Sequence, residues 1–217
     1  MKHVGGRRSG RSEQPGATPR LAWYAVALAL AAGTAHEAGT ADQSMDWQPA
    51  LAWVEPWRAW TAVFVHYSES HLLINAAGLL LVAALGAAAR APLRIGLAWL
   101  VAWPLTQLGL LAQPGLLHYG GLSGVLHAGA AAVAVHLLWT RPGRQRWLGA
   151  AILGGMLLKV LHESPWGPPL RHLPGWDIAL APLAHACGLV AGTLCAALAE
   201  SLCGVRFRQD SANTQHL

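Results

Sequence analysis

The chain has 217 residues, enough for one domain or a small membrane bundle but not for a bundle with a separate soluble catalytic domain. Apolar residues make up 54% of the sequence and charged residues 12%, and the charges cluster between apolar stretches. This pattern excludes an ordinary water-soluble fold and predicts a polytopic membrane protein. The net charge of +5 lies mostly in the connections, so we expect it to set membrane topology and not to bind nucleic acid.

A helix needs about 20 mostly apolar residues to cross a hydrocarbon core of about 30 Å. Six segments approach this length, so the sequence predicts an all-α fold with six transmembrane helices. The first and fifth segments are short, and we expect them to extend into flanking residues such as His36 and His162. In chain order, the segments run from Leu21 to Ala35, Leu72 to Ala89, Ile95 to Leu111, Ser123 to Thr140, Trp147 to Leu161 and Ile178 to Ala199.

The distribution of basic residues predicts the orientation of these segments. With six crossings, both ends of the chain lie on one side of the membrane, and Arg58 and Arg171 fall in the opposite loops. By the positive-inside rule, both termini are cytoplasmic. The basic residues on the terminal side are Lys2, Arg7, Arg8, Arg11, Arg20, Arg90, Arg94, Arg141, Arg144, Arg146, Arg206 and Arg208.

The two ends of the chain are polar. Residues 1–20 are rich in Gly, Arg and Ser and predict a disordered basic cytoplasmic segment, whereas residues 206–217 predict a short cytoplasmic tail. The basic start followed by an apolar run also resembles a secretory signal, with Gly33-Thr34-Ala35 as the candidate cleavage region. We favour an uncleaved first helix, because its removal would break the six-crossing parity that organises the charges.

The connection between the first two predicted helices, residues 36–70, is unusually long. Trp47, Trp53, Trp57 and Trp60 are concentrated in it. Tryptophan favours the membrane interface, so we expect the segment to lie partly in the outer leaflet. Two interpretations remain open, an aromatic belt and a structured flap beside an active site.

Two residues within the apolar segments carry reactive chemistry. Ser123 begins the fourth segment and His185 lies in the sixth. A neutral histidine can accept the proton that makes a serine hydroxyl nucleophilic, and the two residues can meet through helix packing. Gly124, Gly188 and Gly192 are small residues that let transmembrane backbones approach closely. Either residue alone would be read as a helix cap or a core histidine, but ionisable groups within a membrane are costly and indicate function.

Four motifs in order resemble those of the rhomboid intramembrane serine proteases, over roughly residues 50–195. A Gly-x-Ser-Gly string alone is weak evidence, whereas four ordered motifs, each on its expected helix or loop, are specific. The string Gly121-Leu122-Ser123-Gly124-Val125-Leu126-His127 further resembles the rhombosortase branch. The motifs are Trp57-Arg58, then His66 with His71-Leu72-Leu73-Ile74-Asn75, then Gly121-Leu122-Ser123-Gly124, and His185-Ala186-Cys187-Gly188 with Gly192.

The resemblance implies a six-helix protease domain over residues 21–205, with Ser123 as nucleophile, His185 as general base and no cofactor. It also assigns His71 and Asn75, with the Ser123 backbone N–H, to an oxyanion hole, and the spacing of four residues places both side chains on one helix face. Alternatives are that Asn75 joins helices by hydrogen bonding and that His71 reaches the interface.

The chain departs from the commoner rhomboid pattern at one position. Many rhomboids carry a tyrosine four residues after the nucleophile, where this chain has His127. The imidazole can stack on His185 or titrate as a second base, and we favour stacking. No acidic residue is close to His185 in sequence, which predicts a Ser/His dyad and argues against a triad.

The resemblance implies transmembrane protein substrates cut near the outer face of the lipid bilayer. For the rhombosortase branch it implies exported bacterial proteins that end in a Gly-Gly pair, a hydrophobic helix and a basic tail. Two alternatives to a protease are an inactive rhomboid-like membrane binding protein and a haem or metal protein. Candidate ligands for the latter are His66, His71, His118, His127, His136, His162, His172 and His185.

Overall fold

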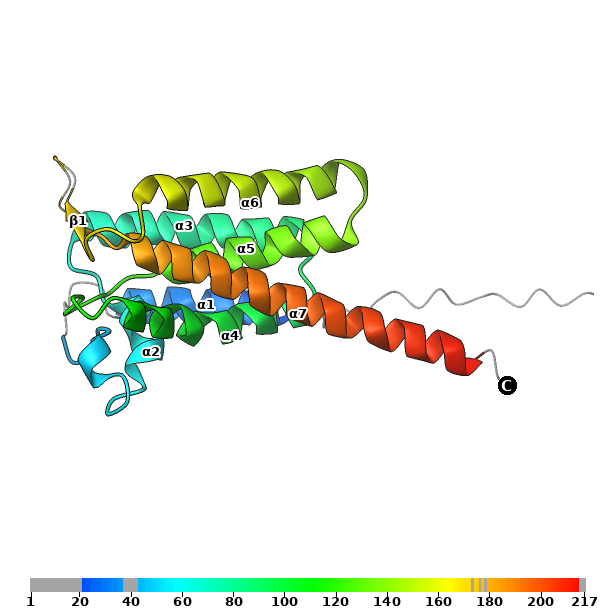
Figure 1. The fold of residues 1–217 in the computed structure, drawn as a ribbon, viewed down its shortest axis with the longest axis horizontal. Helices are drawn as coiled ribbons and strands as arrows, with labels where there is room; N and C mark the ends of the chain where they lie inside the picture. The colour runs from blue at the N-terminus through cyan, green and yellow to red at the C-terminus, as the bar shows by residue number, and fades with distance from the viewer. Residues whose placement is uncertain (1–20, 37–42, 173, 176, 178, 215–217) are drawn as a thin grey trace, which may run out of the picture.

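Six long helices lie side by side in the part of the chain that the structure, a computed structural model, describes (Figure 1). The described residues are 21–36, 43–172, 174–175, 177 and 179–214, with side chains up to residue 203. The predicted disordered segment, residues 1–20, and Ile178 therefore lie outside the described residues. The long helices are α1 (Leu21–His36), α3 (Glu69–Ala88), α4 (Leu93–Gly109), α5 (Ser123–Thr140), α6 (Gly143–Glu163) and α7 (Pro182–Thr214).

Short elements complete the fold at the end of the bundle where α3 and α5 begin. The segment after α1 forms η2 (Pro49–Leu51), α2 (Arg58–Thr61) and η3 (Ala62–Phe64), and η4 (Leu110–Ala112) follows α4. Strands β1 (Arg171–His172) and β2 (Ala179–Leu180) pair antiparallel between α6 and α7. The predicted sixth segment includes Ala179 and Leu180, which is wrong because their backbones pair with β1.

Local sequence explains where the helices begin and end. The Ser68 side chain caps α3 by accepting from the backbone N–H of His71 at 3.2 Å. Proline residues precede α4 and α6 as caps, and Pro182 opens α7. Helix α6 ends where Ser164 adopts a left-handed conformation with φ 55°. The predicted extension of the first and fifth segments is confirmed, since α1 includes His36 and α6 includes His162.

Helix α5 forms the centre of the bundle, and most of its residues are buried. Its small residues allow neighbours to approach closely. A Cβ atom at Gly129 would lie 2.6 Å from the Trp99 ring of α4, and the Trp99 indole donates to the Val125 carbonyl at 2.9 Å. Helix α6 is peripheral by comparison, with Gly149 and Val160 as its buried residues. Buried packing contacts therefore hold α5 in place, and α6 packs against α5 at the periphery of the bundle.

Many large apolar side chains point outward from the bundle, as expected for a lipid-facing surface. By length and composition, four of the described helical spans could cross a membrane, namely 69–88, 93–112, 123–140 and 182–203, and α1 is a shorter apolar helix. The chain is thus a multi-pass membrane protein, whereas the count of six crossings remains a prediction. Helix α7 continues to Thr214, so residues 206–214, predicted as a tail, are helical.

Candidate active site

Ser123 is the first residue of α5 and lies at the end of the bundle that carries the β-hairpin. The backbone turns into the helix at Gly121, whose φ of +118° is a conformation that favours glycine. The Gly121 N–H donates to the Ala62 carbonyl at 2.9 Å. The chain before Ser123 is therefore tied to the segment that follows α1.

His185, near the start of α7, faces Ser123 at the contact between α5 and α7. The distance from His185 Nε2 to Ser123 Oγ is 3.0 Å, which is a hydrogen-bonding distance. The His185 residue is buried, with 4% of its surface exposed. The structure thus brings together the two residues that the sequence analysis named as nucleophile and base.

Glycines permit this approach of α5 and α7. A Cβ atom at Gly188 would overlap the Gly124 carbonyl oxygen, and one at Gly192 would overlap the Ala128 carbonyl oxygen. A Cβ atom at Gly124 would lie 2.9 Å from the Ala184 carbonyl oxygen, next to His185. Backbone-to-backbone packing therefore sets the separation of Ser123 and His185.

His127 lies one turn after Ser123 and stacks on His185. The ring centroids are 4.4 Å apart and the ring planes are inclined by 16°. His127 Nδ1 donates to the Ser123 carbonyl at 2.7 Å, because a carbonyl oxygen can only accept. The ring is thus held between the start of α5 and the imidazole of His185.

His71 and Asn75 project from α3 toward the same place. An added Cβ atom at Gly121 would lie 2.6 Å from His71 Nε2 and 3.2 Å from Asn75 Nδ2, so both side chains lie against the turn before Ser123. Asn75 is 3% exposed, and its Nδ2 has no hydrogen-bond partner among the described residues. A buried amide donor beside the nucleophile is available for a ligand atom.

An acidic residue that sequence reasoning missed also contacts His185. Glu163, the last residue of α6, places Oε2 2.6 Å from His185 Nδ1, and Lys159 Nζ lies 2.7 Å from Glu163 Oε1. The absence of an acidic residue near His185 in sequence therefore does not mean that His185 lacks an acidic neighbour in space. The available signal was a single carboxylate that directly follows an apolar segment.

These polar groups line one cavity of about 460 Å³. Residues of α3, α5, α6, β2 and α7 form its walls, and Ser123, His185, His71, Asn75 and Glu163 contribute to them. The remaining lining is largely apolar and includes Ile74, Leu81, Leu126 and Met156. An apolar cavity with a few convergent polar groups is the usual form of a ligand site.

The Trp57-Arg58 motif lies outside the Ser123 cavity, and its Arg58 side chain binds the buried carboxylate of Asp46. Arg58 Nη1 donates to the Asp46 carbonyl at 2.8 Å and lies 3.3 Å from Asp46 Oδ1. Asp46 Oδ2 is 2.7 Å from the Tyr67 hydroxyl and 2.8 Å from His118 Nδ1. Burial, the hydrogen bond to Asp46 and the charge of Asp46 raise the pKa of Tyr67. Trp57 is half exposed beside this network, so neither motif residue lines the Ser123 cavity.

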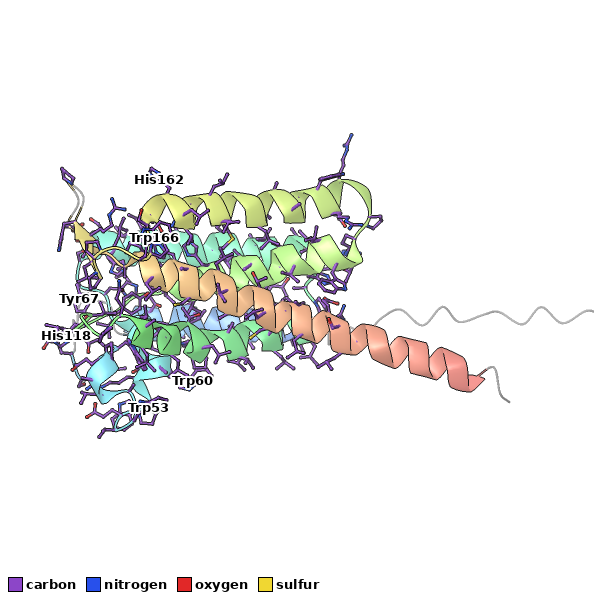
Figure 2. The ribbon with its side chains drawn as sticks, in the orientation of Figure 1. Trp53, Trp60, Tyr67, His118, His162 and Trp166 are labelled. Atoms are coloured by element: carbon purple, nitrogen blue, oxygen red, sulfur yellow. The ribbon has the colours of Figure 1, made fainter. Side chains whose placement is uncertain are left out.

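Tyr119 connects that network to Ser123. Its backbone pairs with Trp47 through hydrogen bonds of 2.7 and 2.9 Å. Burial raises the pKa of the Tyr119 phenol to about 12, against the opposing interaction with Ser123, so the hydroxyl stays protonated. The connection between α1 and α3 thus positions the turn before Ser123. Tyr67 of this connection and His118 of the chain before Ser123 lie at the same end of the bundle as His162 (Figure 2).

The histidines considered as haem or metal ligands do not form a single cluster. His127 and His185 stack beside Ser123, whereas His136 hydrogen-bonds to Glu200 at 2.7 Å toward the opposite end of α5. Within the described ranges, no group of three or more His, Cys, Asp or Glu side chains is arranged to hold a metal ion.

Comparison with known proteins identifies the family. The model of the Rhomboid domain matches residues 54–201, which is more than half of the chain and includes Ser123 and His185. A comparison with curated proteins gave no match. On the strength of the domain match, the chain belongs to the rhomboid family.

Proposed function

We propose that the chain is an intramembrane serine endopeptidase with Ser123 as nucleophile and His185 as general base. The observation that carries this proposal is the 3.0 Å distance between Ser123 Oγ and His185 Nε2 inside a helical membrane bundle. Rhomboid proteins are generally serine proteases, although some members are inactive. An intact serine and histidine at hydrogen-bonding distance support the active class.

The chemistry begins with proton transfer. His185 Nε2 accepts the Ser123 hydroxyl proton while Oγ forms a bond to the carbonyl carbon of the substrate. His185 then gives this proton to the leaving amine as the peptide C–N bond breaks. The acyl group remains on Ser123 until a water molecule, or another nucleophile, releases it with His185 again as the base. The base contributes about 10²–10⁴-fold to the rate.

The oxyanion of the tetrahedral intermediate requires donors beside Ser123. We assign this role to the His71 and Asn75 side chains together with the Ser123 backbone N–H. The unpartnered Nδ2 of Asn75 supports the assignment, because a buried donor is costly unless it serves a ligand or transition state. His127 supports the base by stacking on its ring.

The substrates in this proposal are proteins with one membrane crossing. A largely apolar cavity that Ser123 helps to line suits an apolar chain, and small or helix-breaking residues would let the backbone unwind into it. The rhombosortase-like string at Gly121–His127 favours a more specific class, exported proteins with a C-terminal Gly-Gly pair, a hydrophobic helix and a basic tail.

The proposed setting is a bacterial inner membrane that the six long helices cross, with both termini cytoplasmic and Ser123 near the outer face. The basic residues support this orientation. Arg90, Arg94 and Arg141 gather at the end of the bundle where α3 and α5 end, whereas Ser123 begins α5 at the other end.

Cleavage of a reporter protein tests the proposal. The reporter carries the Gly-Gly, hydrophobic and basic C-terminal segments and is expressed with the full chain, with Ser123→Ala, or with Ser201→Ala. Ser201 is the matched control, because its hydroxyl only bonds back to the Ala197 carbonyl within α7. The proposal expects cleavage with the wild type and Ser201→Ala and none with Ser123→Ala. Equal processing by all three would refute it.

A further inference from the structure

Glu163 reaches His185 from a different helix and on the opposite side of the imidazole from Ser123. Its Oε2 lies 2.6 Å from His185 Nδ1, while His185 Nε2 lies 3.0 Å from Ser123 Oγ. We propose that Glu163 is a positioning residue for His185, so that the site works as a Ser–His–Glu triad. The inference rests on the proposed protease function and assigns a third member to the same site.

The hydrogen bond fixes the tautomer of the base. An ionised carboxylate only accepts hydrogen bonds, so His185 Nδ1 carries the proton that it donates to Glu163. The lone pair of the neutral ring is then on Nε2, which faces Ser123. That tautomer is the one a general base needs, and the carboxylate also stabilises the imidazolium that forms during catalysis.

Lys159 holds the carboxylate from the other side. It lies one turn earlier on α6, and its Nζ donates to Glu163 Oε1 at 2.7 Å. Lys159 Nζ is also 3.2 Å from His185 Nδ1, but an ammonium group has no lone pair and cannot receive the Nδ1 proton. One carboxylate oxygen of Glu163 thus binds Lys159 on the same helix, and the other binds His185.

Helix stability does not account for the position of Glu163. A carboxylate in the last turn of a helix faces the negative end of the macrodipole, which is unfavourable. An exposed ion pair between residues four apart on a helix stabilises the helix only weakly. The Glu163 side chain is 14% exposed and points at a residue of α7. The contact with His185 therefore explains why a carboxylate occupies this unfavourable position at the end of α6.

Several charged or titratable groups surround His185 and enter any interpretation of pH dependence. They are Ser123 and His127 from α5, Lys159 and Glu163 from α6, and His71 from α3. Among them, Glu163 is the group that places a negative charge on the Nδ1 side of the ring. Removing that charge disfavours the protonated imidazole, so the acidic limb of a reactivity profile should move to lower pH.

The test uses the full chain in proteoliposomes and a fluorophosphonate probe, which reports the reactivity of Ser123 without knowledge of the substrate. The variants are Glu163→Gln and the control Glu69→Gln, which neutralises an exposed carboxylate at the start of α3. We expect Glu163→Gln to slow labelling by about 100-fold or more and to lower the pH of the acidic limb. The control should match the wild type in both respects.

A rescue experiment separates positioning from a purely structural role. Glu163→Ala removes the side chain, and added formate can supply a carboxylate next to His185. Labelling of Glu163→Ala should rise with formate concentration, whereas labelling of the wild type and Glu69→Gln should not. Thermal unfolding of each variant establishes that the labelled proteins are folded.

The outcomes distinguish the two proposals. Labelling of Glu163→Gln within threefold of the wild type, with an unchanged acidic limb, would overturn this inference alone. An unfolded Glu163→Gln leaves the decision to Glu163→Ala, where absence of formate rescue in folded protein overturns the triad. A folded wild type that is not labelled at Ser123 at any pH would overturn both the proposed function and the triad.

Discussion

The imidazole rings of His127 and His185 are stacked, with centroids 4.4 Å apart and planes inclined by 16°. The contact predicts that His127 acts through its flat face. His127→Phe or His127→Tyr should keep reactivity within about tenfold of the wild type, because either ring can cover His185. His127→Ala should lose on the order of a hundredfold, because a misplaced base reacts slowly. Probe labelling rates measure both effects, and equal losses in all three variants would instead favour direct proton transfer by His127.

Asn75 should contribute mainly to the transition state. Removal of one oxyanion donor lowers kcat by about 10²–10³-fold. We therefore expect Asn75→Ala to lower kcat on a cleaved reporter by that amount with little change in KM. Gln107→Leu is the matched control, because Gln107 is a fully buried amide that does not line the cavity. A change confined to KM would show that Asn75 binds the substrate without stabilising the oxyanion.

Gly188 should be required for the approach of α5 and α7. A Cβ atom there would overlap the Gly124 carbonyl oxygen, so Gly188→Ala should destabilise the protein by about 1–3 kcal/mol and slow Ser123 labelling. Gly154→Ala on α6 is the control, since nothing lies within 4 Å of its Cβ position. Thermal unfolding in detergent measures the difference, and equal melting temperatures for the two variants would contradict the packing argument.

The proposed orientation predicts which ends of the helices are reachable from outside the cell. In a background with the three native cysteines replaced by alanine, Leu117→Cys should react with a membrane-impermeant maleimide on intact cells. Leu117 is 73% exposed in the segment before Ser123. Gln145→Cys, exposed in the first turn of α6, should react only after permeabilisation. The reverse pattern would place the site on the cytoplasmic side.

Much of this site could be predicted because its parts occupy local motifs. Ser123 follows a glycine turn and starts an apolar run, and the predicted bounds of α5 agree with the structure. Asn75 lies one helical turn from His71, so their shared face follows from the helical repeat. The close glycine contacts between α5 and α7 were likewise readable from small residues.

Contacts between distant segments were not predictable from hydropathy. Glu163 and His185 meet because α6 and α7 end and begin at the same end of the bundle, and no local pattern records that pairing. The β-hairpin was not predictable for the same reason, because Arg171 pairs with Leu180 across the connection between those helices. The Asp46 network also joins side chains that are far apart in sequence.

The central claim, that Ser123 is a nucleophile activated by His185, is tested most directly by mapping the fluorophosphonate adduct on the purified full chain. Mass spectrometry of the labelled protein should place one adduct on Ser123 of the wild type. The adduct should be absent from Ser123→Ala and form at least about 100-fold more slowly in folded His185→Ala, which lacks the base. A folded wild type with no adduct at Ser123, or equal labelling rates with and without His185, would contradict the account.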